Sequence, residues 1–146
     1  MQNLSLKLNM DAMEDTFFED TAMLGIVTAA PPYRLCWILN EFFDIDFARD
    51  PEQNIDLKRK GIEYRFPIYH YDLPNSTHKY LLYKLKQGSE PLLPETRQLD
   101  YLWLVQTGNA EADAMWLVQQ LRNISDVQLA TPLDPDQMKS IANLLI

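Results

Sequence analysis

Leu93-Pro94-Glu95-Thr96-Arg97-Gln98-Leu99-Asp100-Tyr101-Leu102-Trp103-Leu104-Val105 contains the most apolar run of this 146-residue chain. Alternate side chains of a β-strand point to opposite faces of the sheet. From residue 99 onwards both sets are apolar, with Leu99, Tyr101, Trp103 and Val105 on one face and Leu102 and Leu104 on the other. A strand that is apolar on both faces is covered on both faces. The stretch therefore predicts a central strand over residues 99–105, which follows directly on a proline and two carboxylates.

The N-terminal part of the sequence predicts one strand and one helix. Residues 22–28 form a short apolar run rich in β-formers, which is typical of a buried strand. Pro31 and Pro32 favour the start of a helix, because the fixed φ and missing N–H of proline are tolerated in the first turn. The helix that follows has a broad apolar face, made of Leu35, Cys36, Ile38, Leu39, Phe42 and Phe43. We expect this helix to be mostly buried.

The middle of the sequence predicts a β-hairpin. The polar stretch 48–60 indicates a loop or a weak edge strand. Alternation of apolar residues then begins over 62–69, and after turn residues at 73–77 it resumes over 79–86, with Leu81, Tyr83 and Leu85 pointing inward. Because Pro67 has no N–H to donate to a neighbour, we expect its strand to be an edge strand or to be bulged there.

The C-terminal part predicts a second helix and a last strand. Asn109 is a suitable N-cap, and Glu111 and Asp113 favour the positive end of the helix that follows. Apolar residues then recur at helical spacing, at Ala114, Leu117, Val118 and Leu121. Residues 127–130 indicate a short strand, residues 132–135 a turn, and residues 136–145 a short closing helix or turn.

These elements together predict one α+β domain over residues 1–146, with a mostly antiparallel sheet and two main helices on one face. No internal repeat or long linker divides the sequence. The order of strand, helix, hairpin, strand, helix and strand suggests the ferredoxin-like arrangement as the specific topology.

The composition restricts the partners. The chain has 21 Asp and Glu against 13 Lys and Arg, for a net charge of −8. This charge repels phosphate backbones and anionic lipid, so we expect neither nucleic acid nor membrane as a partner. The single cysteine, Cys36, cannot form an internal disulfide, and the sequence has neither a secretory leader pattern nor an apolar run long enough to span a bilayer. We therefore expect a cytoplasmic protein.

Three blocks of the sequence resemble a known family. LPETRQLDY, residues 93–101, is similar to the signature Ile/Leu-Pro-Glu-x-x-x-Val/Leu-Asp-Tyr of the IPExxxVDY family of small bacterial proteins. LGIVTAAPPYRLCWILN at 24–40 and LDPDQMKSIANLLI at 133–146 resemble the same family. The signature positions are Leu93, Pro94, Glu95, Leu99, Asp100 and Tyr101, and the sequence departs from the pattern in having leucine, not a β-branched residue, at 93 and 99. The resemblance implies a cytoplasmic bacterial protein and assigns no activity, substrate or cofactor.

The two acids of the signature invite two interpretations. Glu95 and Asp100 can be an acid and a base, because carboxylates in different environments can divide these roles. Their spacing argues against a preformed pair, since they point to opposite faces of a strand and lie about 140° apart on a helix. The structural interpretation is that Pro94 sets the approach to the strand, Glu95 takes a local partner and Asp100 is a hydrogen-bonded acid beside a buried strand. Arg34 is a candidate partner of either acid, or a ligand for an anion.

Other candidate sites have weaker support. Tyr69, His70, Tyr71 and His78 surround the hairpin, but no basic patch or RNA-reading signature accompanies them, so we expect cross-strand packing. Two histidines eight residues apart make a poor metal site, and Cys36 lies on an apolar helix face without an adjacent base. We expect no cofactor and no metal.

The preferred hypothesis for function is a non-enzymatic protein-interaction domain. Trp116 lies off the apolar stripe of its helix and, if exposed, indicates an interface. The partner is then a second copy, bound through the hairpin edge or the Trp116 surface, or another protein. The alternative is a small-molecule-binding protein or weak enzyme with a pocket near Glu95, Asp100 and Arg34, joined by His70.

Overall fold

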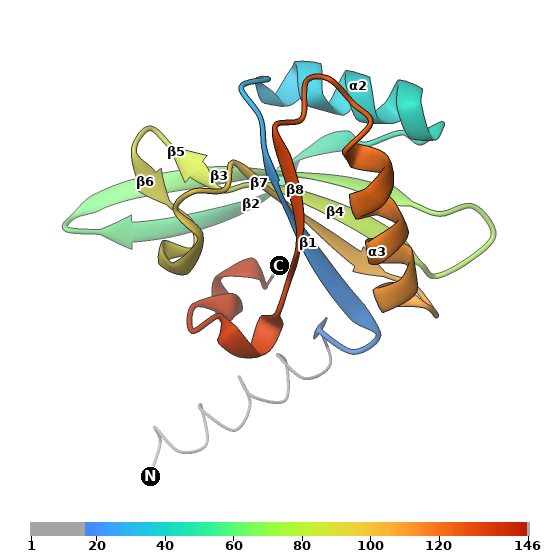
Figure 1. Ribbon diagram of the computed structural model, residues 1–146. Coiled ribbons are helices and arrows are strands. Elements are labelled where there is room, and N and C mark those ends of the chain that lie inside the picture. The colour runs from blue at the N-terminus through green and yellow to red at the C-terminus, as the bar shows by residue number, and fades with distance from the viewer. Residues whose placement is uncertain (1–16, 146) are drawn as a thin grey trace, which may run out of the picture.

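A computed structural model describes residues 17–145, and its centre is a six-stranded sheet (Figure 1). The strands are β1 (Thr21–Val27), β2 (Ala48–Arg59), β3 (Ile62–Asp72), β4 (Lys79–Lys84), β7 (Tyr101–Gln106) and β8 (Leu129–Leu133). Their order in the sheet is β2-β3-β4-β7-β1-β8, and each neighbouring pair is antiparallel. Residues 1–16 of the leader, and Ile146 of the third block, lie outside the described residues.

The other elements lie on or beside this sheet. The two helices are α2 (Pro32–Phe43) and α3 (Ala110–Leu121). A small second sheet consists of β5 (Lys86–Gln87) and β6 (Glu90–Pro91), and three short 3-10 helices are η1 (Pro94–Thr96), η2 (Pro135–Gln137) and η3 (Ile141–Leu144). Within residues 17–145 no helix has the length and apolar character required to cross a bilayer.

Both helices cover one face of the sheet, which we call the helical face (Figure 1). Leu35 and Leu39 of α2 and Leu117 and Leu121 of α3 are fully or almost fully buried. They belong to one core cluster with strand residues from β1, β4, β7 and β8, namely Leu24, Ile26, Leu82, Tyr101, Trp103, Val105 and Ala130. The α+β class and the placement of the helices on one face are confirmed.

Among residues 17–145, the opposite face, which we call the second face, is covered by short segments and not by α2 or α3. Its strand residues include Phe66, Ile68, Leu81, Tyr83, Leu102 and Leu104. They pack against Leu92, Leu93 and Leu99 of the segment before β7, and against Met138 and Leu144 of the C-terminal segment, residues 134–145. Because β7 lies between β4 and β1 and each of its residues from 101 to 105 is buried, the predicted central strand is confirmed. It begins at Tyr101, however, and Leu99 packs on the second face, not on the face of Tyr101 as expected.

The ferredoxin-like topology is present, with one hairpin inserted. β7, α3 and β8 form a split β-α-β unit around β1, as that arrangement requires. β1, α2 and β4 form a second split unit around β7, because β1 and β4 are both antiparallel to β7. The hairpin of β2 and β3, which the sequence did not predict, is inserted between α2 and β4 and extends the sheet beyond β4.

The stretch 48–60 is a long edge strand, β2, and forms a first hairpin with β3 that the sequence analysis missed. Lys60 and Gly61 both have positive φ, of 52° and 79°, which is the geometry of a tight hairpin turn. β3 pairs with β2 at Pro67 but with β4 only over residues 68–72, so Pro67 lies where one side of β3 is unpaired, as expected. The predicted bulge lies on its partner, because the register of β2 shifts between Arg49 and Asn54, and Asn54 is the residue opposite Pro67.

Two further expectations need correction. α2 is not mostly buried, because Tyr33, Trp37 and Phe42 are exposed. The turn expected at 132–135 comes later, since β8 continues through Pro132 to Leu133. Proline is tolerated there because β8 is an edge strand, with one side free of a ladder.

Candidate functional site

The signature segment runs across the second face of the sheet before it enters β7. Pro94 is the first residue of η1, a position where a missing N–H is harmless. Thr96 is buried, and its hydroxyl donates a hydrogen bond to the carbonyl of Leu93, at 3.2 Å. Leu93 and Leu99 are each 1% exposed and belong to the core of the second face. The apolar signature positions therefore pack into the protein.

Glu95 is exposed and takes both of its partners from one residue of the C-terminal segment. The main-chain N–H of Ser140 donates to Glu95 Oε1 at 2.7 Å, and the Ser140 hydroxyl donates to Oε2. Desolvation acts to raise the pKa of the Glu95 carboxyl, but the hydrogen bonds from Ser140 and nearby main-chain groups outweigh it, so that this pKa lies below its ordinary value. Glu95 therefore has the expected hydrogen-bond partner, but this partner is not local, because Ser140 lies 45 residues further along the chain.

Replacing Ser140 by alanine should raise the pKa of Glu95 towards its ordinary value of about 4.5, because one of its donors is lost. A carboxyl group whose pKa is lowered by folding stabilises the fold fully above its unfolded pKa, and this contribution disappears as pH falls through the lowered pKa. The stability difference between wild type and Ser140→Ala should therefore shrink below about pH 4.5. Carboxyl NMR titration measures the pKa directly, with exposed Glu63 as the internal control; an unchanged Glu95 titration would contradict the contact.

Asp100 lies directly before β7 and accepts a hydrogen bond from Thr28, the residue that follows β1. The main-chain N–H of Thr28 donates to Asp100 Oδ2 at 3.0 Å, and Lys86 Nζ lies 3.3 Å from Oδ1. The next residue acts on the same turn, because the Tyr101 hydroxyl donates to the carbonyl of Ala30 at 2.9 Å. Burial raises the pKa of the Tyr101 hydroxyl, so it stays protonated as a donor at neutral pH. Asp100 is the hydrogen-bonded acid beside a buried strand that the sequence predicted.

We expect Asp100→Ala to lower the free energy of unfolding by about 1–3 kcal/mol, because the N–H of buried Thr28 loses its acceptor. Asp100→Asn should cost less, since the amide oxygen can still accept that bond. Urea denaturation measures both changes. Glu63→Ala, at an exposed position of β3, is the control and should change stability by less than about 0.5 kcal/mol. Equal losses in Asp100→Ala and Glu63→Ala would show that the Asp100 bond contributes nothing.

Arg34 pairs with neither signature acid, so its predicted role as their partner is wrong. Its Nη2 lies 3.4 Å from Asp126 Oδ2, and both side chains are more than a third exposed. The physical reason is position: Asp126 follows α3 and lies beside the first turn of α2, whereas Asp100 and Glu95 are already held by Thr28, Lys86 and Ser140. Arg34 and Asp126 instead line a surface hollow of about 320 Å³.

The four residues of the alternative pocket do not come together. Four of the surface hollows among the described residues have volumes of about 520, 280, 320 and 160 Å³. Arg34 lines the third and His70 the fourth, and neither Glu95 nor Asp100 lines any of these four. His70 Nδ1 is buried and has no hydrogen-bond partner among the described residues. The signature acids therefore face the chain itself.

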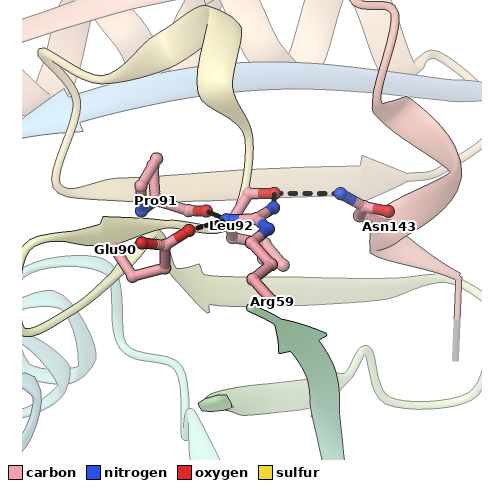
Figure 2. A network of polar contacts seen from close by, with 5 residues as sticks. All are labelled: Arg59, Glu90, Pro91, Leu92 and Asn143. Carbon is pink, nitrogen blue, oxygen red and sulfur yellow. Dashed lines mark hydrogen bonds and ion pairs between the residues drawn. The ribbon is translucent and has the colours of Figure 1, made fainter. Parts of the chain in front are cut away.

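Arg59, which the sequence analysis missed, ties the first hairpin to the same region (Figure 2). Its Nη1 donates to Glu90 Oε1 at 2.7 Å and to the carbonyl of Pro91, and its Nη2 donates to the carbonyl of Leu92 at 3.4 Å. The Leu92 carbonyl also accepts a 3.0 Å bond from Asn143 Nδ2 of the C-terminal segment (Figure 2). The local sequence around Arg59 carries no signal for this role, because its acceptors, one carboxylate and two main-chain carbonyls, lie more than 30 residues further along the chain.

No protein-family model matches this chain, and a search of curated proteins gives no match either. Within the chain, the three blocks quoted above contact one another. The signature block reaches the first block through Thr28 and Ala30 and the third block through Ser140. In each of these contacts at least one partner is a main-chain group. The polar side chains of the signature thus hold chain segments in place.

Exposed apolar side chains are concentrated on the two helices. Tyr33, Trp37 and Phe42 of α2 are 79%, 62% and 45% exposed, and Met115 and Trp116 of α3 are 48% and 54% exposed. We call these five residues the aromatic surface. The ring of Phe43 connects the two helices of this surface, because its centroid lies 4.9 Å from that of Phe42 in α2 and 5.9 Å from that of Trp116 in α3. The condition stated for Trp116 is met, because it is exposed, and the exposed residues of α2 were not predicted.

The remaining candidates have structural roles. Tyr71 and Tyr80 pair across β3 and β4 with ring centroids 6.2 Å apart, and Tyr80 lies 5.3 Å from Trp103, so the expected aromatic packing is confirmed. Burial raises the pKa of the Cys36 thiol to about 12, which leaves it protonated and unreactive. Among residues 17–145 no three His, Cys, Asp or Glu side chains are grouped so as to hold a metal ion.

Proposed function

We propose that this protein is a non-enzymatic protein-interaction domain that binds its partner through the aromatic surface. The observation that carries the proposal is the exposure of Trp37, Trp116, Tyr33 and Phe42 on one layer of the fold. Aromatic residues are enriched at interfaces, and exposed apolar patches mark binding sites more often than chance. Among residues 17–145 the other large apolar residues that are exposed, Ile62 and Leu129, lie on separate strands.

The edge strands of the sheet have features that oppose pairing with a strand of another protein. This favours the exposed residues of the helices as the binding surface. The predicted hairpin edge is absent from the described sheet, because β3 and β4 both have neighbours on each side. The true edges are β2 and β8. β2 has a shifted register and exposed charges at Arg49, Glu52 and Asp56, and β8 contains Pro132, and these are features that block edge-to-edge pairing.

The alternative of a small-molecule binder or weak enzyme has less support. It needs Glu95, Asp100 and Arg34 in one pocket, and each of the three has a separate partner in Ser140, Thr28 or Asp126. No observation favours it over protein binding.

The setting and the family are part of the same proposal. A cytoplasmic bacterial protein of the IPExxxVDY type agrees with the single cysteine and with the three blocks that resemble that family. The contacts of the signature block with both other blocks support the resemblance, because residues that depend on one another are expected to occur together.

Photo-crosslinking in cells of the source organism tests the proposed function. A photoreactive phenylalanine analogue replaces Trp37 or Trp116, and a third variant carries it at Ile62, which is 55% exposed and lies on the first hairpin. We expect one discrete adduct to form from positions 37 and 116 and not from position 62. The absence of adducts at 37 and 116, or the same adducts at 62, would contradict the proposal.

A further inference from the structure

The C-terminal end of α2 carries the wrong charges for a helix end. A helix has a partial negative charge at its C-terminus, which favours Lys or Arg in the last turn. The last turn of α2 has no basic residue; it contains Glu41 and is followed by Asp44 at the C-cap and by Asp46. All three acids are exposed, and none forms an ion pair with another described residue. This end of α2 therefore has an uncompensated negative potential.

The acids of α3 differ, because they are explained within the fold. Glu111 and Asp113 lie in the first turn of α3, where the helix dipole favours acids. Asp113 also accepts a 2.6 Å bond from the Thr107 hydroxyl. The acids at the end of α2, in contrast, have no ion-pair partner among the described residues. A cation that neutralises them therefore comes from outside these residues.

Two of these acids are close in sequence to Phe42 of the aromatic surface. Glu41 and Asp44 flank Phe42 and Phe43 in the chain, and Phe43 contacts the ring of Trp116. The basic residues of the helical layer are engaged elsewhere: Arg34 pairs with Asp126, and Arg122 donates to the carbonyl of Ala130 at 3.3 Å. A ligand at this surface meets aromatic rings and negative charge together.

We propose, building on the proposed function, that the segment bound at the aromatic surface is a Lys- and Arg-rich amphipathic segment of another protein. Its apolar side chains cover Phe42 and Trp116, and its cations neutralise Glu41, Asp44 and the helix end. Lys and Arg also bind the faces of Trp and Phe rings directly. A second copy of this chain fits less well, because a two-fold interface brings two copies of the same acidic patch into one interface.

The test uses two synthetic peptides with the same helical pattern of leucines, one with lysine and the other with glutamate at every polar position. Binding is followed by tryptophan emission, since Trp37 and Trp116 are exposed and Trp103 is buried. We expect the Leu/Lys peptide to bind, with an affinity that falls as salt rises, and the Leu/Glu peptide not to bind.

Matched charge variants locate the site. Glu41→Gln with Asp44→Asn removes two charges, and asparagine tolerates the left-handed backbone of residue 44, with φ of 55°. We expect this variant to bind the Leu/Lys peptide about three- to tenfold more weakly. The control, Glu52→Gln with Glu63→Gln, removes two exposed charges from the first hairpin and should change the affinity by less than about twofold.

Three outcomes overturn the inference: equal losses in the two charge variants, equal binding of the two peptides, or crosslinked adducts that contain two copies of this chain. If heterologous adducts form at positions 37 and 116 but the charge variants bind alike, the inference fails and the proposed function stands. If no adducts form, the proposed function fails independently of the peptide result.

Discussion

Leu99→Ala is expected to lower the free energy of unfolding by about 2–5 kcal/mol, the range for removing a buried leucine side chain. Leu99 is 1% exposed and belongs to the core of the second face. It also fills a space that a side chain at position 25 would otherwise occupy, because a Cβ built on Gly25 would overlap Leu99 Cδ1. Urea denaturation of the variant measures the loss. A cost below about 1 kcal/mol would show that Leu99 is not a core residue.

A double-mutant cycle tests the fit between Gly25 and Leu99. Gly25→Ala alone should cost about 1–3 kcal/mol, because the added methyl group forces Leu99 to move. In the double variant with Leu99→Ala the new methyl group occupies part of the cavity, so the loss should be smaller than the sum of the two single losses by at least about 0.5 kcal/mol. Gly25→Ala combined with Leu121→Ala, on the helical face, is the additive control. Additivity in both cycles would contradict the contact.

Leu144→Ala is expected to cost about 2–5 kcal/mol, although it lies close to the end of the described chain. Leu144 is completely buried, and its carbonyl accepts a 2.7 Å bond from the buried Tyr83 hydroxyl. The neighbouring Leu145 is only partly buried, so Leu145→Ala serves as the control and should cost less than about 1 kcal/mol. Thermal or urea unfolding measures both. Equal losses of unfolding free energy in Leu144→Ala and Leu145→Ala would show that the C-terminal segment is not packed into the core.

The parts of the fold that were predicted depend on local patterns. β7 was recognised because both of its faces are apolar, and α3 because its buried residues recur at helical spacing. β2 was predicted only as one of two possibilities, because an edge strand exposed on most of its length has no apolar alternation to read. The burial of α2 was overestimated, since Phe42 of its predicted apolar face is exposed and Tyr33 and Trp37 lie outside that face.

The candidate site was less predictable for a different reason. Thr28 and Ser140 hold the signature acids through main-chain N–H groups, and every residue except proline has such a group. Residue type therefore gave no indication of these partners. The pairing of Arg34 with Glu95 or Asp100 was predicted from opposite charge alone. Many acids of the sequence have the same charge, and only the folded structure shows that Arg34 pairs with Asp126.

The pairing of β1 has a consequence for biosynthesis. Both of its neighbours in the sheet, β7 and β8, come from the distant C-terminal half of the sequence, and Leu144 follows every strand. A nascent chain thus leaves the ribosome with an apolar strand that has no partner in the sheet until β7 has been translated. Long-range pairing of this kind folds slowly and exposes nascent surfaces to aggregation. Chaperones that cover β1 during translation should therefore raise the yield of folded protein.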